Sequence, residues 1–340
     1  MKRRLFLATP ALLAAALSAD GRKAVRGPAP SSAAGAGRLQ RVAATAFGTT
    51  VSLAGLDDGS PAGRRRTRAA LQAAMREVQD IDAIFSLFRA QSQLSALNRD
   101  GRLDGAHPHL LRNLRFAQQL SARTGGAFDA TVQPLWELFA RARQQRRLPE
   151  AQEIAAARAL VGYRALRLAD GRAELARPGA KVTLNSLAQG YAVDVVVKTL
   201  QCQGVDAALV DTGELGSLGQ AEGARPWTVG LQHPRERGAF IALLAMDGRV
   251  VSTSGDYATA FSSDFRHHHI FDPATGLSPP GFASTVVLAS SGLVADGLST
   301  ALMVLDRAAG ERLVRSYPGA DAVWIDKQGR MQATAGVPFA

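Results

Sequence analysis

The stretch 290–303, with the sequence SSGLVADGLSTALM, constrains the fold most, because it is an apolar helical segment that carries an acid and a hydroxyl in its interior. Asp296 and Thr300 are four residues apart, which places them on one face of a helix. A carboxylate among Leu, Val, Ala and Met is costly to bury unless positive charge compensates it. The pattern therefore predicts a cation at this face, and two oxygen donors favour Mg²⁺ or Ca²⁺ over zinc.

A simpler interpretation of this stretch also stays open. Ser290 or Ser291 can cap the N-terminus of the helix, and Asp296 can then face solvent. This second interpretation needs no ligand, and the stretch alone does not decide between the two.

The N-terminus has the pattern of an export signal over residues 1–19. Basic residues at 2–4 precede an apolar run at 5–17 and small residues that suit cleavage. The arginine pair resembles a twin-arginine signal, although general secretion and an uncleaved anchor stay open. The run is shorter than the ~20 residues of a membrane span. Residues 20–38, rich in Gly, Ala, Ser and Pro, predict a flexible linker, and we expect a periplasmic or cell-envelope location.

Cysteine and charge narrow the classes further. Cys202 is the only cysteine and lies mid-chain, so neither an intramolecular disulfide nor a lipid anchor at the cleavage point is available. This composition predicts a soluble protein of an oxidising compartment. The formal net charge is +11, with basic clusters at 64–68 and 141–147. Aromatic residues do not interleave with these clusters, so we interpret them as solvated helix faces and expect no nucleic-acid partner.

Periodicity predicts an α+β architecture for residues 39–340, because helices and strands mix without strict alternation. Leu71, Met75, Val78 and Ile81 follow a helical period. Further helices are predicted at 107–123, 149–160 and 187–203. Strands are predicted at 41–47, 49–53, 207–210, 227–231, 241–244, 249–252 and 284–288. Asp247-Gly248 predicts a hairpin between two of these strands, and the sequence at 326–329 predicts another turn.

Two segments suit a nucleotide. The glycine pair in TGGAFDATVQPL, residues 124–135, lets backbone approach a ligand closely, although a plain helix-to-loop corner explains it equally. LNSLAQGYAVD, residues 184–194, predicts a polar turn that opens a helix, whose free N–H groups bind phosphate. Asn185 and Ser186 in this turn can instead be simple caps.

Two other segments carry hydroxyls and imidazoles. STSGDY, residues 252–257, is a hydroxyl-rich turn with one acid, and it lacks the G-x-S-x-G order of a hydrolase elbow. Of His267, His268 and His269, only the first and third would share one side of a strand. Since no Cys or His follows at zinc-like spacing, these imidazoles favour a role toward a proton or a phosphate over a zinc site.

Together these segments resemble the ApbE family, the FAD:protein FMN transferases. The motifs that carry the resemblance are 85–88, 92–98, 124–134, 188–194, 211–214, 253–257, 269–276 and 295–302. Their order and spacing agree with the family from about Phe47 to Leu305. Each motif is modest, but the set is specific.

The resemblance implies a fold and an activity. The expected fold is a single compact α+β unit with mixed helices and a largely antiparallel sheet, ApbE-like and related to the T-fold. The expected activity is Mg²⁺-dependent transfer of FMN from FAD to a Thr or Ser hydroxyl of an acceptor redox protein, through a phosphodiester bond and with release of AMP. The acceptor is expected to be exported or membrane-bound, and the resemblance leaves the oligomeric state open.

Position by position, the resemblance also implies site residues. The metal is expected to be held by the Ala188 carbonyl, the Asp296 carboxylate and the Thr300 hydroxyl. His269 matches the histidine that assists proton transfer, and Asp256 in the neighbouring motif is a second candidate base. FAD is expected to be lined by Phe47, Phe88, Ala127, Phe128, Asp129, Asn185, Tyr191 and Ile270.

The chain departs from the usual family pattern at four places. Gln189 replaces a Lys, Asn185-Ser186 replaces a Gly pair, Phe88 replaces a Tyr, and Glu214 stands where a second Gly is usual. These departures weaken individual nucleotide contacts. They keep a non-catalytic flavin-binding protein open as an alternative function. An FAD pyrophosphatase, in which water replaces the acceptor hydroxyl and FMN and AMP are released, is a second alternative.

Overall fold

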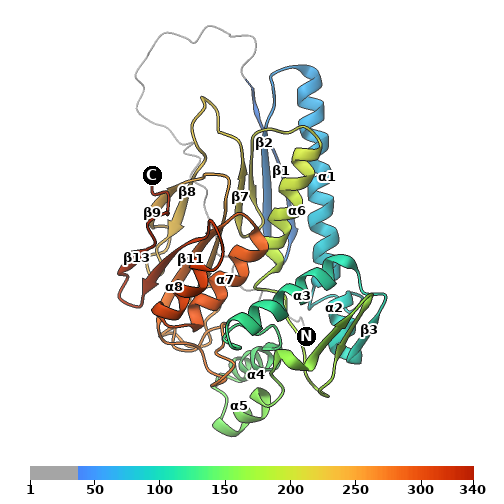
Figure 1. The fold of residues 1–340 in the computed structure, drawn as a ribbon, viewed down its shortest axis with the longest axis vertical. Helices are drawn as coiled ribbons and strands as arrows, with labels where there is room; N and C mark the ends of the chain where they lie inside the picture. Colours follow the sequence, from blue (N-terminus) through green and yellow to red (C-terminus); the bar gives the residue numbers. More distant parts are fainter. Residues whose placement is uncertain (1–36) are drawn as a thin grey trace, which may run out of the picture.

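The computed structural model describes residues 37–340, so the predicted export signal and nearly all of the predicted linker lie outside the described residues. Its centre is an eight-stranded antiparallel sheet in the order β1-β2-β6-β7-β10-β11-β12-β13 (Figure 1). The strands are β1 (Leu39–Ala46), β2 (Thr49–Leu56), β6 (Ala208–Asp211), β7 (Leu215–Leu218), β10 (Val250–Gly255), β11 (Phe282–Ala289), β12 (Asp321–Asp326) and β13 (Met331–Ala333). The predicted α+β class with a largely antiparallel sheet is confirmed.

Eight α-helices and two small sheets complete residues 37–340. The helices are α1 (Pro61–Phe85), α2 (Gln93–Asp100), α3 (Pro108–Arg123), α4 (Gln133–Gln144), α5 (Ala151–Arg158), α6 (Ala188–Cys202), α7 (Gly292–Val304) and α8 (Arg307–Arg315). The small sheets are β3 (Arg102–Asp104) with β5 (Arg172–Leu175) and β4 (Leu166–Ala169), and β8 (Thr228–Gln232) with β9 (Phe240–Ala245). Within this part of the chain, no helix combines the length and apolarity needed to cross a bilayer.

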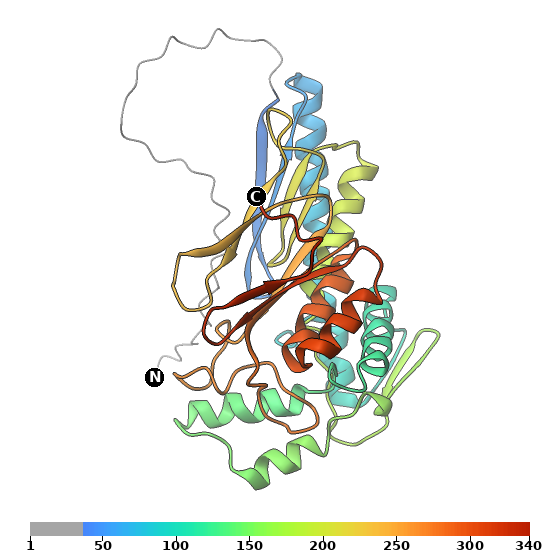
Figure 2. The same ribbon diagram turned by 60° about the vertical axis from the view of Figure 1, so that its left-hand side comes forward.

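The strands of the main sheet bury apolar residues on both faces. On β11, Val287 packs into the core that holds α6 and α7, whereas Val286 and Leu288 pack on the opposite side with β8 and β9. Helices α1, α6, α7 and α8 therefore cover one face, and the β8-β9 sheet covers part of the other (Figures 1 and 2). Period-two alternation along each strand produces this arrangement.

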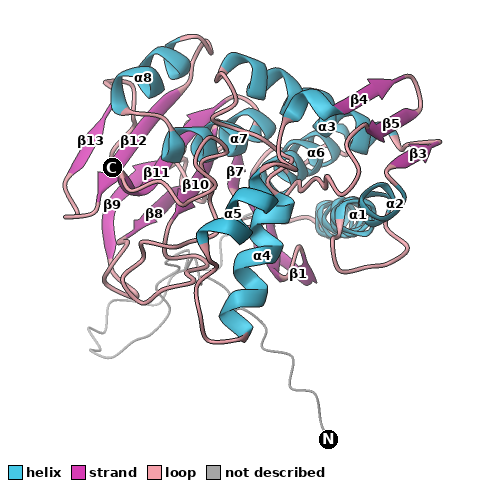
Figure 3. Cartoon of the chain, turned by 90° about the horizontal axis from the view of Figure 1, so that it is seen from below, coloured by secondary structure: helices cyan, strands magenta, loops and turns pink. Residues whose placement is uncertain are grey.

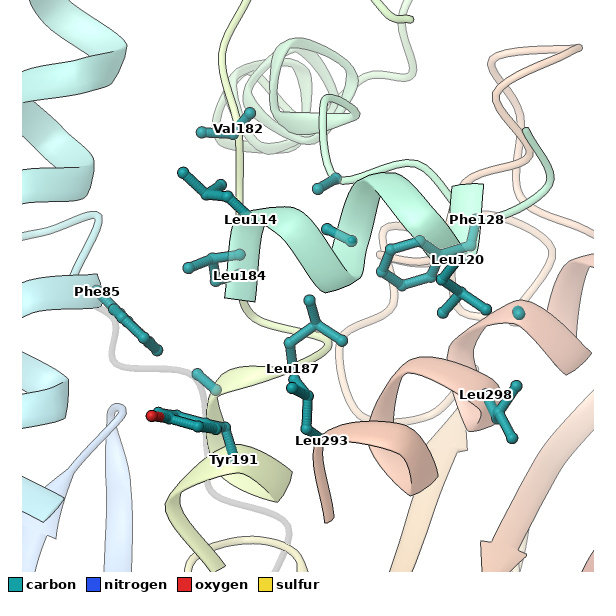
Figure 4. Packing of buried hydrophobic residues seen from close by; sticks show 14 of the residues in the cluster. Phe85, Leu114, Leu120, Phe128, Val182, Leu184, Leu187, Tyr191, Leu293 and Leu298 are labelled. Atoms are coloured by element: carbon teal, nitrogen blue, oxygen red, sulfur yellow. The ribbon is translucent and has the colours of Figure 1, made fainter. Parts of the chain in front are cut away.

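The remaining helices form a second layer beside the first turns of α6 and α7. Helices α3, α4 and α5 lie in the lower part of the molecule in Figure 1, and the view from below shows the small β3-β5-β4 sheet at the margin (Figure 3). Leu114 and Leu120 of α3 belong to the same buried cluster as Leu187, just before α6, and Leu293 in the first turn of α7 (Figure 4). This shared core fixes where the two helices begin.

The predicted hairpin at Asp247-Gly248 is wrong, whereas the turn at 326–329 does join β12 and β13 as a hairpin. β9 pairs with β8, and β10 pairs with β7 and β11, so the chain changes sheet at Gly248. Arg249 explains the change, because its guanidinium binds Asp247 and also Asp321 at the start of β12, each at 2.6 Å. This contact draws the start of β10 toward the main sheet.

Helices α6 and α7 cross with their backbones in contact at Gly190 and Gly292. A Cβ atom at either glycine would lie 2.1 Å from the carbonyl oxygen of the other. We expect Gly190→Ala to lower the free energy of unfolding by about 2–3 kcal/mol, because the two helices would have to separate. Urea unfolding measures this loss. Gly281→Ala, at a position with open space around it, is the control, and equal effects for the two variants would contradict the close crossing.

Candidate active site

Helix α7 is anchored at its N-terminus by a carboxylate of α6. Asp194 accepts hydrogen bonds from the Ser291 hydroxyl at 2.7 Å and from the Leu293 N–H at 3.1 Å. Ser291 occupies the cap position, but its hydroxyl donates to Asp194 instead of capping the helix itself. A carboxylate at this place accepts hydrogen bonds from the free N–H groups, and the positive end of the helix dipole stabilises its negative charge. The position of α7 therefore depends on α6.

Asp296 lies in the middle of α7 and is only 4% exposed. The interpretation that it faces solvent is therefore wrong. Its Oδ2 accepts from the Gly190 N–H at 3.0 Å, and its Oδ1 accepts from the Ser252 hydroxyl at 3.4 Å. No Lys, Arg or His of residues 37–340 pairs with this carboxylate, and burial raises its pKa.

A chain of hydroxyls connects Asp296 to Thr300. The Thr300 Oγ1 lies 3.1 Å from the Ser254 hydroxyl, which lies 2.8 Å from that of Ser299. Ser299 is in turn 3.3 Å from Ser252, the donor to Asp296. Two strand residues and three residues of α7 thus place hard oxygen atoms in one small, mostly buried region.

This donor set suits a hard divalent cation. The Gly190 N–H bond brings the first turn of α6, which includes Ala188, against the Asp296 carboxylate. In residues 37–340, no three His, Cys, Asp or Glu side chains converge, so a cation here would be held largely by hydroxyl and carbonyl oxygens. Such a sparse, oxygen-only set is typical of Mg²⁺ completed by phosphates and water. Asp296 and Thr300 lie in this region and Ala188 lies in the adjoining first turn of α6, so the set suits the metal-binding role, which stays a prediction.

Glu214, recognised in the sequence only as a departure, also belongs to this region. It is 7% exposed and precedes β7, and its Oε2 accepts from the Thr253 N–H at 2.9 Å. Burial and the nearby negative charge of Asp296 raise its pKa. A single acid in a loop carries no periodic signal, so only the fold reveals that it lies beside Asp296.

These raised pKa values give a pH dependence. The unfolded chain loses the protons of Asp296 and Glu214 near their ordinary pKa, but the folded chain holds them to higher pH, so stability is lost as pH rises through the raised values. A bound cation offsets this loss. We expect Mg²⁺ to raise the melting temperature more on the alkaline side of neutrality than on the acid side. Thermal unfolding across pH, with and without Mg²⁺, measures it, and a larger shift at acid pH would contradict the expectation.

A cavity of about 550 Å³ opens at the C-terminal end of α7. Its walls include residues 124–127 and Asp129, 272–274 and 304–306. Val304 is four residues after Thr300 and eight after Asp296, so the three share one face of α7. The cavity therefore begins about one helical turn from the Thr300 hydroxyl. The glycine-rich motif at 124–134 and the motif at 269–276, which are far apart in sequence, both line this cavity.

Asp129, within the glycine-rich loop, orders this loop through hydrogen bonds to backbone N–H groups. Gly125 and Gly126 have φ values of 62° and 90°, which favour glycine, and both line the cavity with Ala127. Asp129 is buried and accepts from the N–H groups of Thr131 at 2.8 Å and Tyr163 at 2.7 Å. Burial raises the pKa of Asp129. Its position in the wall orders the loop and leaves the glycine backbone facing the cavity.

Sequence analysis missed three further residues of this cavity. Tyr163 and Arg164 line it from the short 3-10 helix Tyr163–Ala165, and Arg177 lines it from the bend that follows β5. The Arg164 guanidinium lies 4.9 Å from the centre of the Tyr163 ring, and Arg177 donates to the Ala159 carbonyl at 2.7 Å. Aromatic and guanidinium groups suit a base and a phosphate. No motif or spacing marked them in the sequence.

His269 is oriented by the backbone of a neighbouring loop. The backbone N–H of His269 donates to the Thr259 carbonyl at 3.0 Å, and the ring Nδ1 lies 3.3 Å from the same oxygen. Because a carbonyl only accepts, Nδ1 carries the proton and Nε2 keeps a lone pair. Burial lowers the pKa of His269, so the ring is neutral near pH 7. This is the state that a general base requires.

Asp256 has a different environment from the one expected of a base. It is fully buried, and its two oxygens accept from Arg235 at 2.8 Å each, with Lys327 at 2.6 Å from one of them. Because the side chain is fully buried and both oxygens already bind cations, Asp256 does not face a substrate hydroxyl. The geometry therefore favours His269 as the base and gives Asp256 the role of holding Arg235 and Lys327.

The predicted aromatic FAD contacts divide into exposed and buried residues. Phe88 is 84% exposed, on a loop fixed by the 2.8 Å ion pair of Arg89 with Asp82. Asp82 also accepts from the Phe47 N–H at 2.9 Å, so the two predicted aromatic positions are linked. An exposed ring on an ordered loop is available for stacking on a flat ligand.

Most of the other residues that were predicted to line FAD are buried in the hydrophobic core. Tyr191 is 4% exposed, and its hydroxyl bonds His109 Nδ1 at 2.5 Å. Phe128 and Ile270 are also buried, whereas Asn185 is exposed before α6. Tyr191, Phe128 and Ile270 therefore support the shape of the site, and Asn185 is free to reach a ligand.

Comparisons with known proteins agree with this geometry. The ApbE family model matches residues 47–324. The FAD:protein FMN transferase of Klebsiella pneumoniae is 32% identical over 291 residues, covering 82% of this chain and 81% of that protein. The flavinyl transferase ApbE of Pseudomonas stutzeri, in its apo form, has a TM-score of 0.75 at 32% identity, covering 88% of this chain and 96% of that one.

A third relative extends the match. The ApbE protein of Thermotoga maritima superposes with a TM-score of 0.78 at 26% identity, covering 88% of this chain and 97% of that one. The family match spans the glycine-rich loop, the crossing of α6 and α7, and the region around Asp296 and Thr300. The chain belongs to the ApbE family.

Proposed function

We propose that this chain transfers FMN from FAD to a Thr or Ser hydroxyl of an acceptor protein and releases AMP. One observation carries the proposal most: Asp296 is buried without a cationic partner among the described residues, about two helical turns before the end of α7 that lines the cavity with the glycine-rich loop. The names of the relatives, FAD:protein FMN transferase and flavinyl transferase, support the same activity.

The chain's own oxygens provide the place for a divalent cation. Ala188, Asp296 and Thr300 would hold Mg²⁺, as the donor set suggests. When bound, such an ion stabilises the negative charge that develops on phosphate oxygens during transfer. Thr212 and Asp194 keep the donors in place, since the Thr212 hydroxyl donates to the Gln189 carbonyl at 2.7 Å and Asp194 anchors α7.

His269 would handle the proton. The acceptor oxygen forms a bond to the phosphorus of the FMN half, the pyrophosphate bond to AMP breaks, and the hydroxyl proton passes to Nε2 of His269. The Thr259 carbonyl keeps Nδ1 protonated and the ring correctly turned. Phe88, which is exposed, would stack on the isoalloxazine ring, and the cavity lined by Tyr163 and Arg177 would take the nucleotide.

Mass spectrometry of a candidate acceptor peptide, incubated with this protein, FAD and Mg²⁺, tests the proposal. The expected result is a mass gain of one FMN on Thr or Ser together with an equal amount of AMP. Free FMN with no modified peptide would instead support an FAD pyrophosphatase. Stoichiometric FAD binding without AMP would support a flavin-binding protein, and either result would overturn the transferase proposal.

We also propose that the protein works outside the cytoplasm, on an exported or membrane-bound redox protein. The pattern of residues 1–19 supports export, and the described part of the chain contributes a free thiol only at Cys202. Fractionation of cells that express the full chain tests the location. A protein that stays with the cytoplasmic marker would contradict it.

A further inference from the structure

Two departures from the usual family pattern meet at one point in the fold. Glu214 precedes β7, and Gln189 lies in the first turn of α6. Their segments touch, because the Gln189 amide would lie 2.0 Å from a Cβ on Gly213, the residue before Glu214. A position that usually holds Lys therefore holds a neutral amide, and a neighbouring position that usually holds Gly holds a carboxylate.

Strand pairing directs Glu214 toward Asp296. β7 pairs with β10 through Leu215 and Val251, so Glu214 lies beside the hydroxyl-bearing part of β10. The Thr253 N–H binds one oxygen of Glu214 at 2.9 Å, and the adjacent Ser252 hydroxyl has a single proton for the two carboxylates beside it. Backbone geometry thus holds Glu214 at the same group of hydroxyls that surrounds Asp296.

The charges of this region do not balance among the described residues. Asp296 and Glu214 are both buried, and no Lys, Arg or His of residues 37–340 forms an ion pair with either. Two buried carboxylates close together are costly unless a cation or a proton compensates them. A divalent cation, which the proposed function already requires at Asp296, supplies two positive charges at this place.

We propose that Glu214 is a second carboxylate of the cation site, so that this chain binds the divalent ion with the charge of Glu214 as well as that of Asp296. The inference rests on the proposed function for the position of the cation. Two consequences follow. The ion binds more tightly than a single carboxylate allows, and FAD binding depends strictly on the ion, because no basic side chain among the described residues pairs with these two acids and could take the place of the ion toward a pyrophosphate.

Isothermal titration with Mg²⁺ alone, without FAD, tests the first consequence. Glu214→Gln keeps an oxygen for the Thr253 N–H but removes the charge, and we expect its Kd for Mg²⁺ to rise about tenfold or more. Glu222→Gln is the matched control, because Glu222 is exposed and its change removes the same charge elsewhere. If Glu214→Gln binds Mg²⁺ as tightly as the unchanged protein, the inference is overturned.

Gln189→Lys provides a second variant if Glu214→Gln does not fold. A lysine at 189 would place an ammonium group beside Glu214, so we expect weaker Mg²⁺ binding and measurable FAD binding without Mg²⁺. FAD fluorescence quenching in a chelating buffer reads the latter. Unchanged Mg²⁺ affinity and no metal-free FAD binding would overturn the inference.

These outcomes separate the inference from the proposed function. If Asp296→Asn abolishes Mg²⁺ binding while Glu214→Gln leaves it unchanged, Glu214 has no part in the site and the proposed function is untouched. If Glu214→Gln weakens Mg²⁺ binding but the unchanged protein modifies no acceptor peptide, the inference holds and the transferase proposal fails.

Discussion

Replacing Asp296 with Asn is expected to lower the rate of FMN transfer by about 10³-fold, because the site loses the carboxylate that faces the divalent ion. The same change should leave the metal-free protein as stable as before, or more stable. Asn keeps its oxygen for the Gly190 N–H, its amide nitrogen can donate to the Ser252 hydroxyl oxygen, and the change removes a buried charge near Glu214. Activity and stability would therefore move in different directions.

Two measurements together check this expectation. Initial rates of peptide modification give the loss of activity, and melting temperatures with and without Mg²⁺ give the response to the ion. Asp170→Asn, the same chemical change at a fully exposed side chain, should alter neither. A variant at position 296 that still gains stability from Mg²⁺ would show that the ion binds elsewhere.

The second large effect is expected at His269. His269→Ala should slow transfer to the acceptor by about 10²- to 10⁴-fold, the usual contribution of a positioned general base. Binding of FAD and Mg²⁺ should be unchanged, because the imidazole is held by the Thr259 carbonyl and not by the cation region. Since burial lowers the pKa of His269, the acid limb of the rate profile should lie below pH 6.5.

A neighbouring histidine provides the control for this variant. His267 packs against Phe139 with ring centres 6.0 Å apart, so His267→Ala should change stability more than it changes the pH profile. The decisive comparison is the acid limb, which a merely structural role would not move. If His269→Ala keeps both the rate and the limb of the unchanged protein, another group accepts the proton.

Much of the architecture could be predicted from periodicity. Helix α3 begins at Pro108 and ends at Arg123, close to the predicted 107–123, and α6 spans nearly all of the predicted 187–203. Such elements have strong local patterns, so tertiary contacts only adjust their ends. The hairpin at Asp247-Gly248 failed because a turn sequence specifies a local reversal but not which strands will pair. There, the ion pair of Arg249 with Asp321, 72 residues away, draws β10 into the main sheet.

In the candidate site too, features with a local sequence pattern could be predicted, and features that depend on long-range contacts could not. The spacing of Asp296 and Thr300 predicted a common helix face, and the structure buries Asp296 without a cationic partner among the described residues. Glu214 and Arg177 lie in loops without any period, and their positions depend on long-range strand pairing and packing. The ion pairs of Asp256 could not be predicted from the sequence either, because Arg235 and Lys327 come from the turns of two different sheets.

The direct meeting of main chains at Gly190 and Gly292 has a consequence for how this scaffold can change. Where two helices are spaced by side chains, each exchange of core residues alters their separation. Here the spacing is set by peptide atoms, so the surrounding hydrophobic residues can drift in evolution or be redesigned for heat tolerance without widening the gap between the α6 donors and α7. A protein engineer could therefore vary this interior extensively, provided that both glycines stay.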